Sequence, residues 1–386
     1  MYEIKTMNKI AQQGLDILAA NGFVLNVDSP NPDGMLIRSA KLHDETFGDR
    51  LLAIARAGAG TDNVPVDRCT AAGIAVFNSA GANAEAVKEL TLCGLLLASR
   101  DIAGGIAWVK SIAGEADVAA AVEKGKANFV GPELNGKTLG VVGLGAIGSR
   151  VANAAVSLGM TVYGYDPYMS VDAAWRLRSE INHAPDLDTI YRQCDYIALH
   201  LQCNDETKGM INSASIAKMK PGVRIVNFAR GGLIKDADML SALSMGKVAR
   251  YVTDFPNNAL TGAPGVVAIP HLGASTPESE DKCAIMAAQE LADYLKNGNL
   301  KNSVNLPNVT LDRTGVARLC VIHKNIPKVL NSILDLVAKK DINVENMVNK
   351  SRGEIGYTII DLGSPLDDEA CKAISSMSTV LRMRII

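Results

Sequence analysis

Short apolar runs alternate with helical patterns through most of the chain. The runs are rich in branched aliphatic residues and are bounded by polar or glycine-containing segments, which is typical of strands buried in a parallel sheet. Strands that alternate with helices predict an α/β fold with doubly wound parallel sheets. The predicted strands are residues 2–7, 23–27, 34–37, 51–55 and 74–77, followed by 139–142, 161–165, 196–201, 223–228, 251–255 and 266–269.

Helical patterns are clearest at about residues 8–20, 83–99 and 277–297. The segment 83–99 is apolar on nearly all sides, which predicts burial between domains or subunits. The segment 277–297 begins with Thr276 as N-cap and Pro277 in its first turn, two residues that favour a helix start.

The pattern changes after residue 315. Apolar strand-like segments now enclose two helical segments in the order βαββαβ, which is the order of a ferredoxin-like domain. We therefore expect a separate small domain at residues 315–386. Its strands are predicted at 316–322, 342–349, 357–362 and 380–385, and its helices at 327–339 and 367–377.

One strand–turn–helix–strand unit carries the glycine pattern of a dinucleotide site. Its turn is residues 143–148, with the sequence GLGAIG. Gly143 permits the tight turn, Gly145 lets a pyrophosphate approach the backbone, and Gly148 lets the helix pack close to the strand. The diphosphate would lie at a helix N-terminus, where unpaired N–H groups favour an anion. Asp166 ends the second strand, where a carboxylate accepts hydrogen bonds from a ribose 2′-hydroxyl and repels a 2′-phosphate, so the unit predicts NAD.

Composition argues against several classes of partner. The 386 residues carry a formal net charge of −2 and are 48% hydrophobic, so neither nucleic acid nor an anionic membrane is indicated. The 7 cysteines are scattered without a CxxC pair, which favours reduced thiols over disulfides and predicts no metal site. The chain also lacks a signal-peptide pattern and an apolar run long enough to span a bilayer. We expect a cytoplasmic protein.

Two polar side chains follow predicted strands at the sheet edge where ligands of doubly wound domains bind. Arg230 follows one strand, and His271 follows another. A guanidinium can hold a carboxylate or a ketone oxygen through two parallel hydrogen bonds, and an imidazole can transfer a proton near neutral pH. The alternatives are an exposed arginine at a turn and a histidine satisfied at a helix entrance. Asp254, which ends a third strand between them, favours the catalytic interpretation.

Six segments in fixed order extend this interpretation. They are RAGAGTDNV (56–64), NSAGANAEAV (78–87), GKTLGVVGLGAIG, NFARGG, PHLGAST and SVNLP (303–307). The chain resembles the D-2-hydroxyacid dehydrogenases over about its whole length, and within them the phosphoglycerate dehydrogenases that carry a C-terminal ACT domain. The resemblance implies a substrate-binding domain at 1–98 and 287–310, an inserted Rossmann NAD-binding domain at 99–286, and an ACT regulatory domain at 315–386.

The resemblance also implies an activity, the NAD-dependent oxidation of 3-phospho-D-glycerate to 3-phosphohydroxypyruvate, which is the first step of L-serine biosynthesis. His271 would exchange the hydroxyl proton, Arg230 would hold the carboxylate and polarise the C2 oxygen, and Asp254 would contact the nicotinamide carboxamide. The remaining residues that it assigns are Gly143, Gly145, Ala146, Ile147, Gly148, Asp166 and Ala229 for the cofactor, and Arg56, Ala57, Gly58 and Asn83 for the substrate, with Arg56 reaching its phosphate.

Two alternatives stay open. One is a hydroxypyruvate, glyoxylate or other D-2-hydroxyacid reductase, against which Arg56 and the C-terminal domain argue. The other is a non-catalytic NAD(H)-sensing protein. It is supported by Asn258, which occupies the place of the glutamate that pairs with the histidine in the family, and which has no charge to stabilise an imidazolium. Glu278 and Glu280 lie near His271 in sequence, but they are more simply explained as first-turn helix acids.

The small domain carries a possible effector loop. His323, Asn325 and Asn343 match positions that contact an amino-acid effector in serine-inhibited relatives. Lys328 stands where those relatives have a glycine that lets two ACT domains and a small amino acid meet closely, which argues against effector binding. We expect a homodimer or homotetramer, while the effector and the preferred direction of reaction stay open.

Overall fold

The computed structural model describes residues 1–386, leaving position 172 aside, and the chain divides into two compact units. The first unit is Met1–Asn83 together with Pro277–Ile386, and the second is Ala84–Thr276. The sequence analysis begins the NAD-binding domain at residue 99, whereas helix α3 (Ala84–Ser99) packs on strands β10 and β11 of the second unit. The structure therefore places this helix within the second unit.

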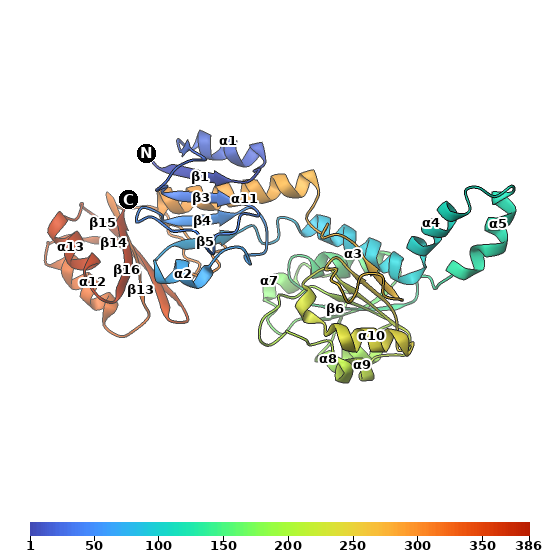
Figure 1. Ribbon diagram of the computed structural model, residues 1–386. Coiled ribbons are helices and arrows are strands. Elements are labelled where there is room, and N and C mark those ends of the chain that lie inside the picture. Colours follow the sequence, from blue (N-terminus) through green and yellow to red (C-terminus); the bar gives the residue numbers. More distant parts are fainter. The chain divides into compact units, whose positions relative to one another are not determined.

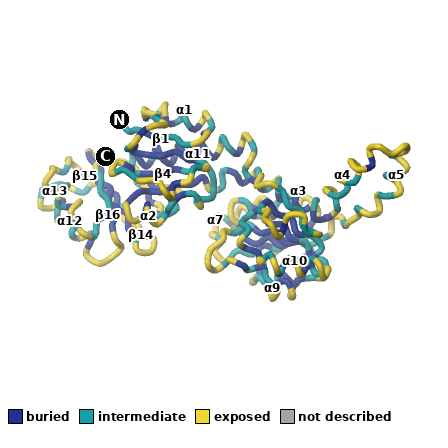
Figure 2. Tube along the Cα trace, in the orientation of Figure 1, coloured by how far each residue is buried: buried dark blue, intermediate teal, exposed yellow. Residues whose placement is uncertain are grey.

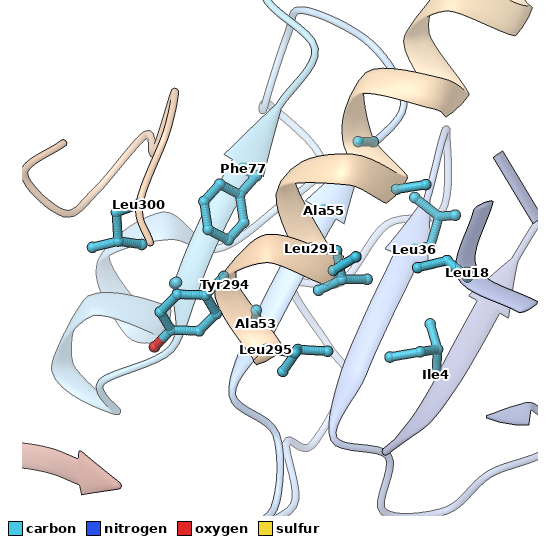
Figure 3. Close-up of a cluster of buried hydrophobic side chains, with 14 of the residues drawn as sticks. Ile4, Leu18, Leu36, Ala53, Ala55, Phe77, Leu291, Tyr294, Leu295 and Leu300 are labelled. Carbon is cyan, nitrogen blue, oxygen red and sulfur yellow. The ribbon is translucent and has the colours of Figure 1, made fainter. Parts of the chain in front are cut away.

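The first unit contains a five-stranded parallel sheet with the order β2-β1-β3-β4-β5 (Figure 1). Helices α1 and α11 pack together, and α11 also lies against β3, β4 and β5. Leu291 and Leu295, one helical turn apart on α11, share a buried cluster with Leu36 and Phe77 of the sheet (Figure 3). The elements are β1 (Glu3–Met7), α1 (Gln12–Ala20), β2 (Val24–Leu25), β3 (Gly34–Ile37), β4 (Ala53–Arg56), α2 (Val66–Ala71), β5 (Ala75–Asn78) and α11 (Pro277–Asn297).

The first unit also contains a four-stranded antiparallel sheet with the order β14-β15-β13-β16. Its element order is βαββαβ, which confirms the predicted ferredoxin-like arrangement. Successive residues of β13 alternate between two apolar layers: Leu319 and Val321 pack with α12 and α13, whereas Cys320 and Ile322 join the core around α11. The elements are β13 (Ala317–Lys324), α12 (Val329–Ala338), β14 (Val344–Arg352), β15 (Ile355–Leu362), α13 (Asp368–Ser375) and β16 (Val380–Ile385).

The second unit is built on a seven-stranded parallel sheet with the order β12-β11-β10-β9-β6-β7-β8. Strand β6 lies between β7 and β9, so the strand order reverses at this point, and ligands of such sheets bind outside the carboxyl ends of the strands there. The strands are β6 (Thr138–Val142), β7 (Thr161–Tyr165), β8 (Asn182–His183), β9 (Tyr196–Leu199), β10 (Val223–Asn227), β11 (Val248–Thr253) and β12 (Val266–Ala268).

Helices α6 (Gly148–Ser157), α8 (Leu187–Gln193), α9 (Ser213–Lys218) and α10 (Asp236–Ser244) connect or flank these strands. Helices α4 (Ile102–Ser111) and α5 (Val118–Gly125), which the sequence analysis did not predict, form a largely exposed pair (Figure 2). No single helix of the described chain is long and apolar enough to cross a membrane, and α3 with α4 meets that test only as a pair bent by 68°.

Glu290 is a buried acid on α11. The side-chain amide of Asn302 donates to its Oε1 at 2.7 Å, while Oε2 has no hydrogen-bond partner among the described residues. Burial raises the pKa of Glu290 from the ordinary 4.5 to about 7. Between pH 4.5 and about 7, the folded protein keeps a proton on Glu290 that the unfolded chain has released. The free energy of unfolding therefore falls as the pH rises through this range.

We expect Glu290→Gln, which keeps an acceptor for Asn302 but carries no charge, to stabilise the protein at pH 8 by ~1 to 3 kcal/mol and much less at pH 5. Urea unfolding at the two pH values measures the difference. An equal gain at both pH values would show that the effect does not come from ionisation.

Candidate active site

The glycine turn of the second unit, residues 143–148, has one position at which no neighbouring atom covers the backbone. Gly143 has a φ of +90°, and a Cβ there would lie 2.7 Å from the carbonyl oxygen of His200. A Cβ at Gly148 would overlap the carbonyl oxygen of Gly143, so neither glycine can be replaced without a shift. Beside Gly145, in contrast, no atom lies within 4 Å of the Cβ position. The turn leads into the N-terminus of α6, where an open backbone suits a diphosphate.

Asp166 directly follows β7 at the same edge of the sheet. Its Oδ2 accepts a hydrogen bond from the backbone N–H of Leu144 at 2.9 Å, and its Oδ1 accepts one from Tyr168 at 2.9 Å. Each carboxylate oxygen has a second lone pair, so the group can still accept hydrogen bonds from a ribose. The residues present therefore fit NAD, with the diphosphate at the glycine turn and the adenosine ribose at Asp166.

Asp166→Ala is expected to weaken NADH binding by about 10- to 100-fold, because it removes a charge-assisted hydrogen bond. Binding of NADPH should change less, since the negative charge that repels its 2′-phosphate is also lost. Titration of both cofactors measures the preference, with Asp188→Ala on the exposed surface of α8 as the control. A wild-type protein that binds the two cofactors equally would refute this role of Asp166.

Arg230 lies in the turn after β10. The side chain of a buried asparagine forms hydrogen bonds to the backbone of this turn. The side-chain amide of Asn227 donates to the carbonyl oxygen of Arg230 at 3.0 Å, and its Oδ1 accepts from the N–H of Ala229 at 3.2 Å. The guanidinium Nη1 of Arg230 donates to the carbonyl oxygen of Ala229 at 2.7 Å. The sequence analysis did not identify Asn227 as a supporting residue; its signal is a polar side chain at the end of an apolar strand.

His271 and Asp254 lie side by side after neighbouring strands. Asp254 is 1% exposed, and neither carboxylate oxygen has a hydrogen-bond partner of normal geometry in the described chain. Burial raises the pKa of this carboxyl, against the opposing effect of His271 and of the N–H of Gly273. Nε2 of His271 lies 3.9 Å from Oδ2 of Asp254, and the imidazole packs on the ring of Phe255 with centroids 4.8 Å apart.

The structure places Asp254 beside the imidazole of His271. Asn258 is exposed in the turn that follows Phe255. Glu280 belongs to the first turn of α11, where its Oε1 forms an ion pair with Arg38 at 2.6 Å, in agreement with a helix-start acid.

The four substrate candidates all belong to the first unit. Arg56 ends β4, and its Nε donates to Oδ1 of Asn63 at 3.1 Å. Its guanidinium extends over Gly58, where a Cβ would overlap Nη1, so a side chain at this position would displace the guanidinium. Ala57 lies between them and is held by a 2.7 Å hydrogen bond from its N–H to β3. Asn83 is 8% exposed, and its Oδ1 has no partner among the described residues, which leaves a buried acceptor for a ligand.

The effector candidates lie in the ferredoxin-like domain. His323 is buried on β13, where its Nε2 lies 2.9 Å from the hydroxyl of Thr358. The side chains of Asn325 and Asn343 donate to other groups of the same domain. Lys328 has a φ of +73°, the left-handed conformation that favours glycine, at the N-cap of α12. The effector role of these residues stays a prediction.

Comparison with known proteins gives a family and several relatives. Residues 94–273 match the family described as D-isomer specific 2-hydroxyacid dehydrogenase, NAD binding domain. The D-3-phosphoglycerate dehydrogenase of Bacillus subtilis is 34% identical over 330 residues, which are 81% of this chain and 60% of the relative. The enzyme of that name from Methanocaldococcus jannaschii is 33% identical over 320 residues, which are 81% and 58% of the two chains. The chain thus spans about 60% of the length of these curated relatives.

Solved structures confirm the predicted α/β fold. A 3-phosphoglycerate dehydrogenase from Entamoeba histolytica with bound NAD+ has a TM-score of 0.63 and 25% identity, and the match covers 79% of this chain and 98% of that one. A glyoxylate reductase from Paecilomyes thermophila has a TM-score of 0.65 and 25% identity, with coverage of 78% and 98%.

Proposed function

The chain carries the NAD binding domain of the D-isomer specific 2-hydroxyacid dehydrogenase family, and we propose that it is an NAD-dependent dehydrogenase that oxidises 3-phospho-D-glycerate to 3-phosphohydroxypyruvate. The observation that carries the choice of substrate is Arg56, a cation held beside Gly58 at the end of β4. Relatives named D-3-phosphoglycerate dehydrogenase support it. This oxidation would be the first step of L-serine biosynthesis.

Three residues of the second unit carry the proposed chemistry. Bound NAD supplies the acceptor for the hydride that leaves C2. His271 takes the C2 hydroxyl proton during oxidation and returns it to the ketone oxygen during reduction. Arg230 holds the substrate carboxylate through parallel hydrogen bonds and polarises the C2 oxygen. Asp254 offers a buried acceptor oxygen to the carboxamide N–H of the nicotinamide, which fits a carboxylate that lacks hydrogen-bond partners in the described chain.

Arg56→Ala tests the choice of substrate. We expect KM for 3-phosphohydroxypyruvate to rise about 10- to 100-fold, because a charge-assisted contact to the phosphate is lost. KM for hydroxypyruvate, which has no phosphate, should change little. The control is Arg50→Ala, since Arg50 pairs with Asp33 at the surface of the same unit.

An equal effect of Arg56→Ala on both substrates would instead favour a hydroxypyruvate or glyoxylate reductase, in line with the similarity to the Paecilomyes thermophila enzyme. A protein that binds NADH and turns over neither substrate would be the NAD(H)-sensing alternative.

We also propose that the protein self-associates and that the ferredoxin-like domain is an ACT-type regulatory domain. Apolar residues on the exposed helix α4 support self-association: Ile102, Ile106 and Val109 are 38%, 54% and 44% exposed. The βαββαβ topology supports the regulatory domain.

A further inference from the structure

We propose that Asp254 is the carboxylate partner of His271, a positioning residue that orients the imidazole and stabilises its protonated form. The inference rests on the proposed function and deepens it, because it assigns a second role to a residue otherwise proposed to contact only the cofactor. It also explains how a chain with Asn258 in place of an acid can keep a charged partner for its histidine.

The sheet topology brings the two residues together. Strands β11 and β12 are hydrogen-bonded neighbours, with Thr253 opposite Ala268. The N–H of Ile269 donates to the carbonyl oxygen of Thr253 at 2.9 Å and carries this pairing beyond the end of β12. Asp254 is the residue after β11, and His271 is the third residue after β12, so parallel strands of fixed register bring both side chains to one edge.

Packing then sets the direction of the imidazole. The ring of Phe255, the residue after Asp254, lies against the imidazole at an interplanar angle of 49°. With the ring in this position, Nε2 lies 3.9 Å from Oδ2 of Asp254. This distance is longer than a hydrogen bond, but it is shorter than the limit of about 4 to 6 Å within which an opposite charge favours the charged form of a group.

Burial makes the carboxylate an effective partner. The side chain of Asp254 is 0% exposed, so water screens its charge poorly, whereas that of His271 is 62% exposed and can exchange a proton with a substrate. Arg230 also faces Asp254 and favours its anionic form, and Tyr251 is the other titratable group beside it. The charged pair Asp254–His271 therefore offsets part of the cost of burying the carboxylate.

The arrangement leaves Oδ1 of Asp254 for a second partner. Oδ2 lies 3.9 Å from Nε2 of His271, and both oxygens lack hydrogen bonds of normal geometry in the described chain. The same carboxylate can therefore serve the imidazole with one oxygen and the carboxamide of the cofactor with the other.

The test is a histidine NMR titration of the protein without cofactor or substrate, with the His271 signal assigned from the spectrum of His271→Gln. In Asp254→Asn, which keeps the shape of the side chain and removes its charge, we expect the titration midpoint of His271 to fall by ~1 unit, the lower end of the range because the side chain is 62% exposed. The exposed His43 is the internal control, and its midpoint should stay in place. A thermal melt establishes that the variant is folded.

Asn258→Asp is the matched variant. It adds a carboxylate at the position that the sequence indicates, yet Asn258 is exposed and we expect the His271 midpoint to move by less than a third of the Asp254→Asn shift. On the alkaline side of the pH profile, kcat/KM for ketone reduction should decline at a lower pH in Asp254→Asn than in the wild type. In Asn258→Asp the pH of this decline should be unchanged.

An unmoved His271 midpoint in folded Asp254→Asn would overturn the proposal, as would an Asn258→Asp shift as large as that of Asp254→Asn. The titration does not depend on turnover. An unmoved midpoint in a protein that reduces 3-phosphohydroxypyruvate would therefore overturn the pairing of Asp254 with His271 and leave the proposed function intact. Conversely, a shifted midpoint in a protein without dehydrogenase activity would overturn the proposed function alone.

Discussion

Arg230→Ala is expected to lower kcat/KM for 3-phosphohydroxypyruvate by about 10²- to 10³-fold, the effect of removing one preorganised donor to an oxygen that gains negative charge. The guanidinium would hold the carboxylate and the C2 oxygen together, so its loss affects both position and charge. Asn227 fixes the backbone of this turn, and the side chain is therefore presented from a rigid loop. Steady-state kinetics of ketone reduction measure the effect.

Two further variants separate charge from geometry. Arg230→Lys keeps the charge but loses the planar fork, so we expect it to recover less than a tenth of the lost activity. Arg192→Ala, on the exposed face of α8 where Arg192 pairs with Asp188, should leave kcat/KM unchanged. If Arg230→Ala retained activity within tenfold of wild type, the arginine would be a turn residue rather than a catalytic one.

Local sequence patterns were sufficient for most elements of the fold. The predicted strands at residues 34–37, 161–165 and 380–385 and the predicted helix at 277–297 match the bounds in the structure. Each is an apolar segment of one clear period with a polar, glycine or proline boundary, so local and tertiary preferences agree.

The elements that were misplaced or missed depend on tertiary contacts. Strand β11 begins at Val248, before the predicted start at 251, and it includes Arg250, whose guanidinium pairs with Asp101. A charge within a strand interrupts the apolar pattern, and only the folded chain supplies its partner. Helices α4 and α5 bury no residue of their own, so neither contributes to a core from which its position could be inferred.

The sequence indicated the individual residues of the candidate site but not which of them contact one another. Arg230, Asp254 and His271 were each identified because they follow strands. The contact between Asp254 and His271 depends on the adjacency of β11 and β12, which no local pattern specifies.

A buried ion pair joins the ferredoxin-like domain to helix α11 within the first unit. Nε and Nη2 of Arg318 donate to the two carboxylate oxygens of Asp361 at 2.6 and 2.8 Å, and both side chains are 0% exposed. Nη1 donates to the carbonyl oxygen of Asn297, the last residue of α11, at 2.8 Å, and to that of Leu311 at 2.9 Å. The carboxylate also accepts from the N–H of Thr314 at 2.9 Å.

Arg318→Ala is therefore expected to destabilise the first unit by ~3 to 5 kcal/mol, because it leaves the carboxylate of Asp361 buried without its cation. Burial acts to raise the pKa of Asp361, but the hydrogen bonds from Arg318 and Thr314 outweigh it and hold that pKa below its usual value. Once Arg318 is removed, Asp361 must take up a proton or draw water into the core. Urea unfolding at pH 7 measures the loss.

The double variant Arg318→Met/Asp361→Leu separates an unpaired charge from lost packing. Replacing a whole buried pair by apolar side chains is often neutral, so we expect the double variant to be more stable than Arg318→Ala. It should not reach wild type, because the carbonyl groups of Asn297 and Leu311 lose their donor, at a cost of ~1 to 3 kcal/mol for each that stays buried. Lys340→Ala, which breaks a surface pair with Asp367 in the same domain, should destabilise the protein far less than Arg318→Ala. A double variant as unstable as the single one would mean that Arg318 stabilises the domain through the two carbonyl groups and not through its charge.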